Sequence, residues 1–348
     1  MDIWIDGRAG CSSSRTGKGQ WVLRVVAALL EKTPLTILTD GNPVPDAWRV
    51  PGATIRALPR GMLWHWRALK VLKCDRPDVF IASSSFIVPA LLPRHRCCIL
   101  IVHDLIAFQN HPHQWKAKII ERITLRRALR KAAHICTVSD STKKDLVAQF
   151  PFVRPENISV VFAGSLEQDP TPNIPDGKTI LCPGTLCPRK NQLRLLKAYA
   201  GLPPNLRNQY RLLLIGGRGW KDAEIIALAT TTPGAEWRGY VPEEKYRELL
   251  SRCSVLAFPS LYEGFGLPVL DALQRGIPVL TTNRGSLPEV AGSCAVTVDP
   301  ESVESIQNGL KRILSDSDLR QKLRRNGPSQ AKKFSWERTA ELLLSVLQ

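Results

Sequence analysis

Residues Phe258–Asp271 read FPSLYEGFGLPVLD, and this stretch decides the fold class. It follows a short apolar run typical of a strand and turns through Gly264 and Gly266. It then enters a helix with Pro268 near the first turn, where proline is well tolerated. A helix that begins at a glycine-rich turn directs backbone N–H groups and a positive dipole end toward an anion. The stretch therefore predicts a strand–turn–helix unit that can bind phosphate.

Two carboxylates flank this predicted anion site. Glu263 stands just before the turn, at the carboxyl end of the strand, and Asp271 lies about one turn inside the helix. One carboxylate can contact a sugar and the other the paired hydroxyls of a ribose, so the pattern suits a sugar nucleotide. The alternative interpretation is a capped helix with two solvated acids.

Apolar runs like the one before Phe258 alternate with helix-length segments along almost the whole chain. Most are continuous, as in parallel strands covered on both faces. The predicted strands are Asp2–Ile5, Leu35–Thr39, Val79–Ala82, Cys98–His103, Ile135–Ser139, Ile158–Phe162, Thr179–Pro183, Arg211–Ile215, Glu236–Gly239, Val255–Pro259, Pro278–Thr282 and Ala295–Asp299. The amphipathic segments include Trp115–Ala132, Gln192–Ala200, Glu243–Ser251 and Val303–Leu314. This alternation predicts an α/β fold with parallel sheets.

The strand–helix pattern runs twice. It is interrupted by Ser165–Lys178, whose three prolines, one glycine and few apolar residues are typical of a linker. The sequence thus predicts domains at 1–165 and 166–333. Apolar residues at helical spacing in Phe334–Gln348 predict a packed terminal helix at 334–348.

Composition excludes several protein classes. The 348 residues are 44% hydrophobic and 23% charged, unlike a disordered or fibrous chain. We expect a cytoplasmic protein because the nine cysteines are scattered, the N-terminus lacks a signal sequence and no apolar run could span a bilayer.

The net charge is +17, and residues 1–165 hold 24 basic against 12 acidic side chains. The surplus fits an anionic lipid, a nucleic acid or a phosphorylated substrate, or serves solubility alone.

A second anion-binding element is predicted at Pro183–Asn191, PGTLCPRKN, again between a strand and a helix. Its Arg189 and Lys190 can neutralise the charge that builds on a departing diphosphate, a role that a metal ion takes elsewhere. The alternative is a basic helix start, which the helix dipole disfavours.

Two further candidates lie in the first half of the chain. Gly10–Trp21 fails the spacing of a P-loop, so Gly17 and Gly19 are interpreted as a flexible loop that lets a sugar or phosphate approach. His103, followed by Asp104, ends the run CCILIV, at the strand end where open α/β sheets bind ligands. A histidine with a purely structural role is the alternative.

Together these motifs resemble the retaining, GT-B-fold glycosyltransferases of family four, the group 1 glycosyltransferases. EGFGLPVLDA, from Glu263 onward, looks like the E-x₇-E signature of that family. The stretches GTLCPRKN, TVSDSTKKDL, RGSLPEVAG and FSWERTAELL, with the strand-end His103, are also similar to it. The resemblance covers nearly the whole chain and is weakest over Val44–Arg76.

The resemblance implies two Rossmann-like domains that face each other across a cleft. The first would be the acceptor domain, the second would bind the nucleotide-sugar donor, and the C-terminal helix would return to the first. Glu263 would contact the donor sugar, His103 would line the sugar pocket, and Arg189 and Lys190 would hold the diphosphate. Asp271 would bind the ribose. The implied donor-binding residues are Gly17, Gly19, Thr185, Val241, Gly264, Phe265, Gly266, Leu267 and Asp271.

Two positions depart from the family pattern. Asp271 replaces the usual second glutamate, and Thr185 stands where many members carry arginine, which leaves more phosphate charge to Arg189 and Lys190. The version GTL-x-PRKN resembles a branch rich in mannosyltransferases, so we expect GDP-mannose as the donor. The resemblance also implies retention of configuration, with the leaving phosphate taking the proton. We expect no cofactor and no metal, because Cys182 and Cys187 lack zinc spacing.

The segment Trp115–Ala133 holds seven basic residues against one acid. A basic amphipathic helix is typical of proteins that lie on an anionic membrane surface, although a core helix with a solvated basic face is the alternative. The expected partners are a nucleotide sugar, a saccharide or lipid-linked acceptor and the inner face of the cell membrane.

Two other functions stay open at this point. A sugar-nucleotide epimerase can share the GT-B fold, but it needs acid and base carboxylates that we do not identify here. A polyanion-binding protein would explain the charge, but the sequence lacks an aromatic-rich basic platform, so we expect no specific nucleic-acid partner.

Overall fold

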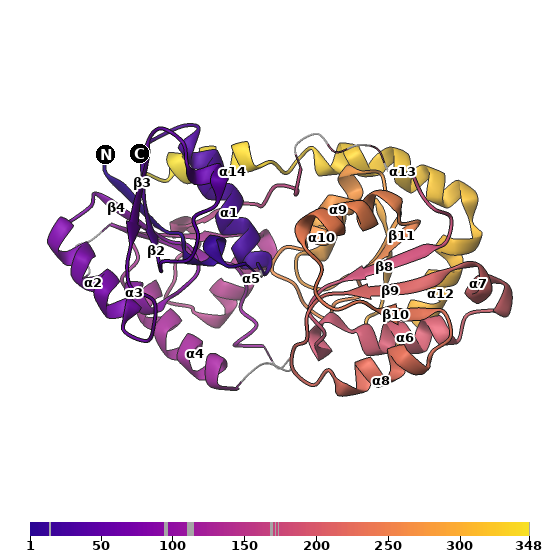
Figure 1. Cartoon of the computed structure of the whole chain (residues 1–348). Helices are drawn as coiled ribbons and strands as arrows, with labels where there is room; N and C mark the ends of the chain where they lie inside the picture. Colours follow the sequence, from indigo (N-terminus) through magenta and orange to yellow (C-terminus); the bar gives the residue numbers. More distant parts are fainter. Residues whose placement is uncertain are drawn as a thin grey trace. The chain divides into compact units, whose positions relative to one another are not determined.

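The computed structural model describes residues 1–13, 15–93, 97–109, 115–167, 170, 172 and 174–347. Within these ranges the chain forms two compact units (Figure 1). Unit 1 comprises Met1–Gln109, Trp115–Gly164 and Phe334–Gln348, and unit 2 comprises Ser165–Lys333. Residues 168, 169, 171 and 173 of the predicted linker lie outside the described part.

Unit 1 is built on a parallel sheet whose strand order is β3-β2-β1-β4-β5-β6-β7. The strands are β1 (Ile3–Asp6), β2 (Leu35–Thr39), β3 (Ala53–Ala57), β4 (Val79–Ala82), β5 (Cys98–Val102), β6 (His134–Thr137) and β7 (Ile158–Val160). Strands β1, β4 and β5 are buried at every position, because continuous apolar sequence suits a sheet covered on both faces.

One strand was missed by the sequence prediction, and several strand ends differ from it. Strand β3 is an edge strand that pairs only with β2, and Arg56 interrupts its apolar residues, so it has no continuous apolar signal. His103 follows β5 instead of ending it. Ser139 does not end β6, because its side chain caps the next helix by accepting a hydrogen bond from the Thr142 amide at 3.0 Å.

Helices cover the sheet of unit 1, and the last of them comes from the C-terminus. They are α1 (Gly17–Leu30), α2 (Trp64–Asp75), α3 (Ile87–Leu91), α4 (Trp115–Leu129), α5 (Asp140–Gln149) and α14 (Trp336–Ser345). Thr339 of α14 donates a hydrogen bond to the Phe162 carbonyl at 2.7 Å, and Glu341 pairs with Lys32 at 3.0 Å. Helix α14 therefore belongs to unit 1.

Unit 2 repeats the architecture with the strand order β10-β9-β8-β11-β12-β13, all parallel. Its strands are β8 (Thr179–Pro183), β9 (Arg211–Ile215), β10 (Ala235–Trp237), β11 (Val255–Ala257), β12 (Val279–Thr282) and β13 (Ala295–Val298). Its helices are α6 (Gln192–Ala200), α7 (Pro204–Gln209), α8 (Ala223–Thr231), α9 (Glu243–Arg252), α10 (Leu267–Gln274), α11 (Leu287–Ala291), α12 (Val303–Ser315) and α13 (Ser317–Ala331).

Each sheet has a point where the strand order reverses. In unit 1 it lies between β1 and β4, and in unit 2 between β8 and β11. Ligands of open α/β sheets bind at the carboxyl ends of the strands beside such a point. Each unit thus offers a place for a ligand beside its reversal point. In the described part of the chain, no helix combines the length and apolarity needed to cross a bilayer.

Candidate active site

At the reversal point of unit 2, a carboxylate lies between two cations. Glu263 follows β11, whereas Arg189 and Lys190 follow β8, in the 3₁₀ turn η4 (Pro188–Lys190). Glu263 Oε2 lies 2.8 Å from an Arg189 guanidinium nitrogen, and its Oε1 lies 2.6 Å from Lys190 Nζ. All three side chains are largely buried. The three residues predicted to bind sugar and diphosphate therefore form one ion triad.

Burial and charge act in opposite directions on this triad. Burial alone would raise the pKa of Glu263, but Arg189 and Lys190 hold it below its ordinary value. For Lys190, burial lowers the pKa more strongly than Glu263 raises it, and Arg189 lowers it further. The triad carries a net charge of about +1 when all three groups are ionised, which attracts an anion.

The loop that carries Glu263 is held in place by its own turn and by Ser286. Gly266 precedes α10 with φ +102°, and an added Cβ would lie 2.7 Å from the Leu287 side chain. Ser286 Oγ donates to the carbonyls of Glu263 at 3.0 Å and Phe265 at 2.8 Å. The strand–turn–helix unit predicted from the sequence is present here, and it fixes the backbone on which Glu263 stands.

The turn that contains Arg189 and Lys190 is also held in place by hydrogen bonds, which come from the adjacent Asn191. Asn191 has the left-handed φ of +63°, and its side-chain amide donates to the carbonyls of Pro259 at 3.0 Å and Pro300 at 2.7 Å. Arg189 also donates to the Tyr262 carbonyl at 2.8 Å, and Lys190 Nζ lies 4.6 Å from the centroid of the Phe258 ring. The two cations are thus positioned before any ligand arrives.

Asp271 lies on α10 and is buried. One carboxylate oxygen accepts a hydrogen bond from the Leu166 amide at 2.7 Å, and the other accepts one from the Tyr246 hydroxyl at 3.3 Å. This predicted ribose ligand therefore holds the start of unit 2 against α10.

The other predicted donor residues of unit 2 occupy three loops. Gly264, Phe265, Gly266 and Leu267 continue directly from Glu263 into α10, so they border the triad. Thr185 is exposed just after β8. Val241 is half-buried in the loop before α9, where the neighbouring Arg238 is paired with Glu236 at 2.7 Å.

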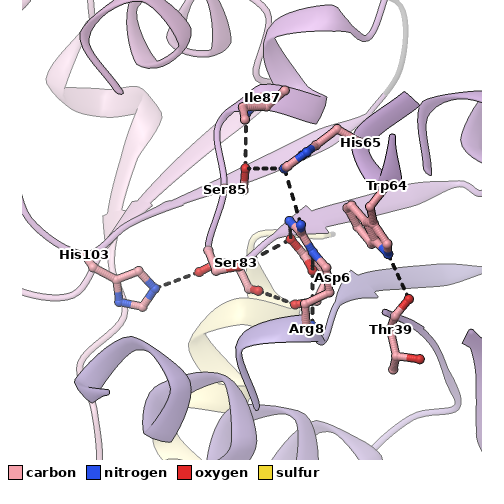
Figure 2. Close-up of polar contacts among 10 residues, drawn as sticks. Asp6, Arg8, Thr39, Trp64, His65, Ser83, Ser85, Ile87 and His103 are labelled. Atoms are coloured by element: carbon pink, nitrogen blue, oxygen red, sulfur yellow. Dashed lines mark hydrogen bonds and ion pairs between the residues drawn. The ribbon is translucent and has the colours of Figure 1, made fainter. Parts of the chain in front are cut away.

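In unit 1, His103 lies just past β5 and is buried. Its Nε2 donates a hydrogen bond to the Ser83 carbonyl at 2.7 Å (Figure 2). Its ring meets the edge of Trp21 at a centroid distance of 5.1 Å. Burial, with a smaller contribution from Lys18, lowers the pKa of His103 to about 4. The imidazole is therefore neutral at pH 7, with Nδ1 as its acceptor nitrogen.

The prediction of a loop through Gly17 and Gly19 is wrong. Both residues lie in the first turn of α1. A Cβ on Gly19 would lie 2.7 Å from the Ala9 carbonyl oxygen, whereas one on Gly17 would meet no atom within 4 Å. Gly19 is thus explained by the close approach of the 3₁₀ turn Arg8–Cys11 to α1.

Both halves of the chain match known sequence families. Residues 165–330 match the family described as glycosyl transferases group 1, and residues 20–164 match glycosyltransferase family 4. The chain is 32% identical over 297 residues to O-antigen chain mannosyltransferase B of Escherichia coli, which covers 80% of this chain and 74% of that protein. The chain belongs to the group 1 glycosyltransferases of family 4.

Two further comparisons agree with this assignment. O-antigen chain mannosyltransferase RfbU of Salmonella typhimurium is 24% identical over 319 residues, covering 86% of this chain and 88% of that protein. The solved structure of Anabaena Alr3699/HepE in complex with UDP and glucose is 16% identical and has a TM-score of 0.80, covering 100% of this chain and 99% of that one. The predicted family and GT-B fold class are therefore confirmed.

The glycosyltransferase has a second polar cluster, at the reversal point of unit 1, that the sequence analysis missed apart from His103. Asp6, at the end of β1, pairs with Arg8 at 2.8 Å, and the Arg8 guanidinium lies 3.4 Å from the Trp64 ring centroid. His65 Nε2 lies 3.3 Å from Arg8 and 3.4 Å from Ser85 Oγ (Figure 2). The only sequence signal was an acid and three serines directly after two predicted strands.

Three supporting residues of unit 2 were also missed. Asn191 and Ser286 belong to quoted motifs, PRKN and RGSLPEVAG, but nothing in their spacing shows which carbonyls they bind. Tyr246 sits on the amphipathic α9 and has no motif around it. Within the described ranges, no group of three His, Cys, Asp or Glu side chains of the glycosyltransferase could hold a metal ion.

We expect H103Q to flatten the acid end of the stability curve of this glycosyltransferase. Folded His103 stays neutral down to a pKa of about 4, whereas in the unfolded chain it binds a proton below pH 6.5. The unfolded state then binds more protons, so stability is lost as the pH falls from 6.5 to 4, by up to about 3 kcal/mol. Denaturant unfolding of both proteins at pH 4 to 7 measures the difference, and parallel curves would contradict it. Glutamine can still donate to Ser83, so the fold is kept.

Proposed function

We propose that this glycosyltransferase transfers mannose, with retention of configuration, from GDP-mannose to a saccharide or lipid-linked saccharide during surface-polysaccharide synthesis. The buried triad of Glu263, Arg189 and Lys190 carries the proposal. The two relatives that are O-antigen chain mannosyltransferases support mannose as the sugar, and the Anabaena complex with UDP and glucose supports a nucleotide-sugar donor.

The triad suggests how the donor is received. Glu263 neutralises part of the charge on Arg189 and Lys190. A diphosphate brings at least two negative charges, so it competes with Glu263 for both cations. The carboxylate is then released to accept hydrogen bonds from hydroxyls of the donor sugar. In this proposal the diphosphate replaces Glu263 as the anion that is paired with Arg189 and Lys190.

The reaction breaks the bond between the anomeric carbon of mannose and a diphosphate oxygen. An acceptor hydroxyl oxygen bonds to that carbon from the same face, which retains the configuration, and its proton passes to an oxygen of the leaving diphosphate. Arg189 and Lys190 stabilise the charge that develops there, the role that a divalent metal plays in other enzymes. We therefore propose transfer without a metal ion.

Unit 1 supplies the groups for the acceptor in this proposal. Three polar groups lie close together here: the Asp6 carboxylate at the end of β1, the Ser85 hydroxyl after β4 and the His65 imidazole at the start of α2. Such a set can form hydrogen bonds with sugar hydroxyls. His103 adds a neutral imidazole to this set of groups on unit 1.

We also propose that the enzyme attaches peripherally to an anionic membrane surface through the segment Trp115–Ala133. Ile119, Ile120 and Ile123 are exposed on α4 together with Arg122, Arg126 and Arg127. A basic helix face with exposed isoleucines fits a lipid–water interface. The test is co-flotation of the full chain with vesicles that contain phosphatidylglycerol, and a chain that stays in solution would overturn the attachment.

Thermal unfolding with a panel of nucleotides tests the donor proposal. A ligand at 100 times its Kd stabilises the protein by about 2.7 kcal/mol, which shifts the melting curve visibly. We expect GDP and GDP-mannose to raise the Tm, with and without a chelator, and UDP, ADP and TDP and their sugars to have little effect. If UDP-sugars raised the Tm instead, GDP-mannose would be the wrong donor. If the chelator abolished the Tm shift, the proposal of transfer without a metal ion would be wrong.

A further inference from the structure

A pocket of about 380 Å³ on unit 1 has no part in the sites described above. It lies between α4 and the end of α5, and its walls include Arg122, Arg126, Phe108, Phe150 and Phe152. Two guanidiniums and three aromatic side chains line this hollow, which is therefore positively charged and partly apolar. Such a lining suits an anionic group attached to an apolar body.

The charge around this pocket is not neutralised by the protein. Within the residues that the structure describes, Arg122, Arg126, Arg127 and Arg130 form no ion pair with a carboxylate, whereas Arg238 of unit 2 pairs with Glu236. Arg122 Nε donates to the Ala107 carbonyl at 2.8 Å, and its guanidinium lies 5.6 Å from the Phe108 ring centroid. This arrangement fixes one guanidinium at the pocket and leaves its charge available to a ligand.

Apolar side chains are exposed on the same face of α4. Ile119, Ile123 and Arg126 follow one another at helical spacing, and the isoleucines are 49% and 59% exposed. Phe152, which lines the pocket, is 41% exposed, and the Arg130 guanidinium lies 5.0 Å from its ring centroid. A free phosphate or a nucleic acid would explain the arginines but leave the isoleucines in water. A lipid surface covers both kinds of side chain.

We propose that this pocket binds the headgroup phosphate of an anionic membrane phospholipid, with Arg122 and Arg126 as its hydrogen-bond donors. Ile119, Ile123 and Phe152 then enter the interface around the bound lipid. The inference rests on the proposed membrane attachment and adds a defined lipid site to it. It predicts that Arg126 contributes more to lipid binding than a neighbouring arginine of equal charge.

The chain offers a matched pair for the test. Arg126 and Arg127 are adjacent on α4, both are exposed and neither has a carboxylate partner in the described part, but only Arg126 lines the pocket. One basic side chain near an anionic surface is worth about fivefold in partitioning. We therefore expect R127Q to lower partitioning to phosphatidylglycerol vesicles by about fivefold and R126Q by roughly 30-fold or more. Pure phosphatidylcholine vesicles should bind all three proteins weakly.

The results for R126Q and R127Q can distinguish the lipid site from charge-driven membrane attachment and from the transferase function. Equal losses in R126Q and R127Q would overturn the lipid site while leaving charge-driven attachment in place. If R126Q weakened binding of inorganic phosphate or of a double-stranded oligonucleotide but not of vesicles, the lipid would be the wrong ligand. Both variants should keep the wild-type Tm shift with GDP, because neither residue belongs to the donor site, so failure of the lipid site would leave the transferase proposal intact.

Discussion

In E263Q we expect kcat/KM to fall by roughly 100-fold or more, while the affinity for GDP alone stays equal or increases. Glu263 lies 2.8 Å from Arg189 and 2.6 Å from Lys190, so it would compete with a diphosphate for both cations. Glutamine removes that competition and also removes the carboxylate proposed to hold the sugar. Turnover assays and calorimetric titration with GDP measure the two effects separately.

The same substitution should make stability depend on the nucleotide. Without Glu263 two buried cations lose their counter-charge, which costs about 3 kcal/mol in the ligand-free protein. GDP restores negative charge, so its Tm shift should be larger in E263Q than in wild type. E248Q is the control, because Glu248 forms an exposed pair with Lys245 at 2.7 Å. If GDP affinity fell as far as turnover, Glu263 would contact the nucleotide and our assignment would be wrong.

Replacing Lys190 should weaken nucleotide binding as well as turnover, unlike E263Q. We expect K190M to weaken GDP binding by about tenfold and to lower kcat by roughly 100-fold, because the ammonium holds the diphosphate and stabilises its departure. Methionine keeps the apolar stem against Phe258, whose ring centroid lies 4.6 Å from Lys190 Nζ. K197M is the matched control, since Lys197 pairs with Glu224 at 3.8 Å on the exposed face of α6.

A double substitution tests whether Glu263 and Lys190 act as one unit. Each single variant loses the contact between Glu263 and Lys190, so the sum of the two single effects counts that contact twice, whereas E263Q/K190M loses it once. The double variant should therefore unfold at a higher temperature than the sum of the single effects predicts. Additive effects on the Tm would show that the 2.6 Å contact contributes little to stability.

Much of the fold follows from local sequence, because parallel strands buried on both faces leave continuous apolar runs. Strands β2, β4, β8 and β9 begin and end where the sequence predicts. Strand β3 was missed because an edge strand with one partner needs no continuous apolar run. Gly17 and Gly19 were misinterpreted because glycine serves a loop and a close helix contact equally well.

The candidate site was predictable in its residues but not in their contacts. Glu263 and the pair Arg189–Lys190 stand out at strand ends, yet they are more than 70 residues apart, and only the sheet order places β8 beside β11. The bond from Leu166 to Asp271 spans 105 residues and has no sequence signal. Such long-range pairings depend on topology, which spacing alone does not encode.

Helix α14 gives the chain an interleaved layout. Since Phe334–Gln348 completes unit 1, the stretch Ser165–Lys333 of unit 2 is inserted between two parts of unit 1 in the sequence. Residues Ser165–Lys333 are continuous in the sequence, whereas a fragment that stops at Gly164 lacks the helix that packs against α1. A frameshift at codon 334 would therefore damage the half of the enzyme that is encoded first.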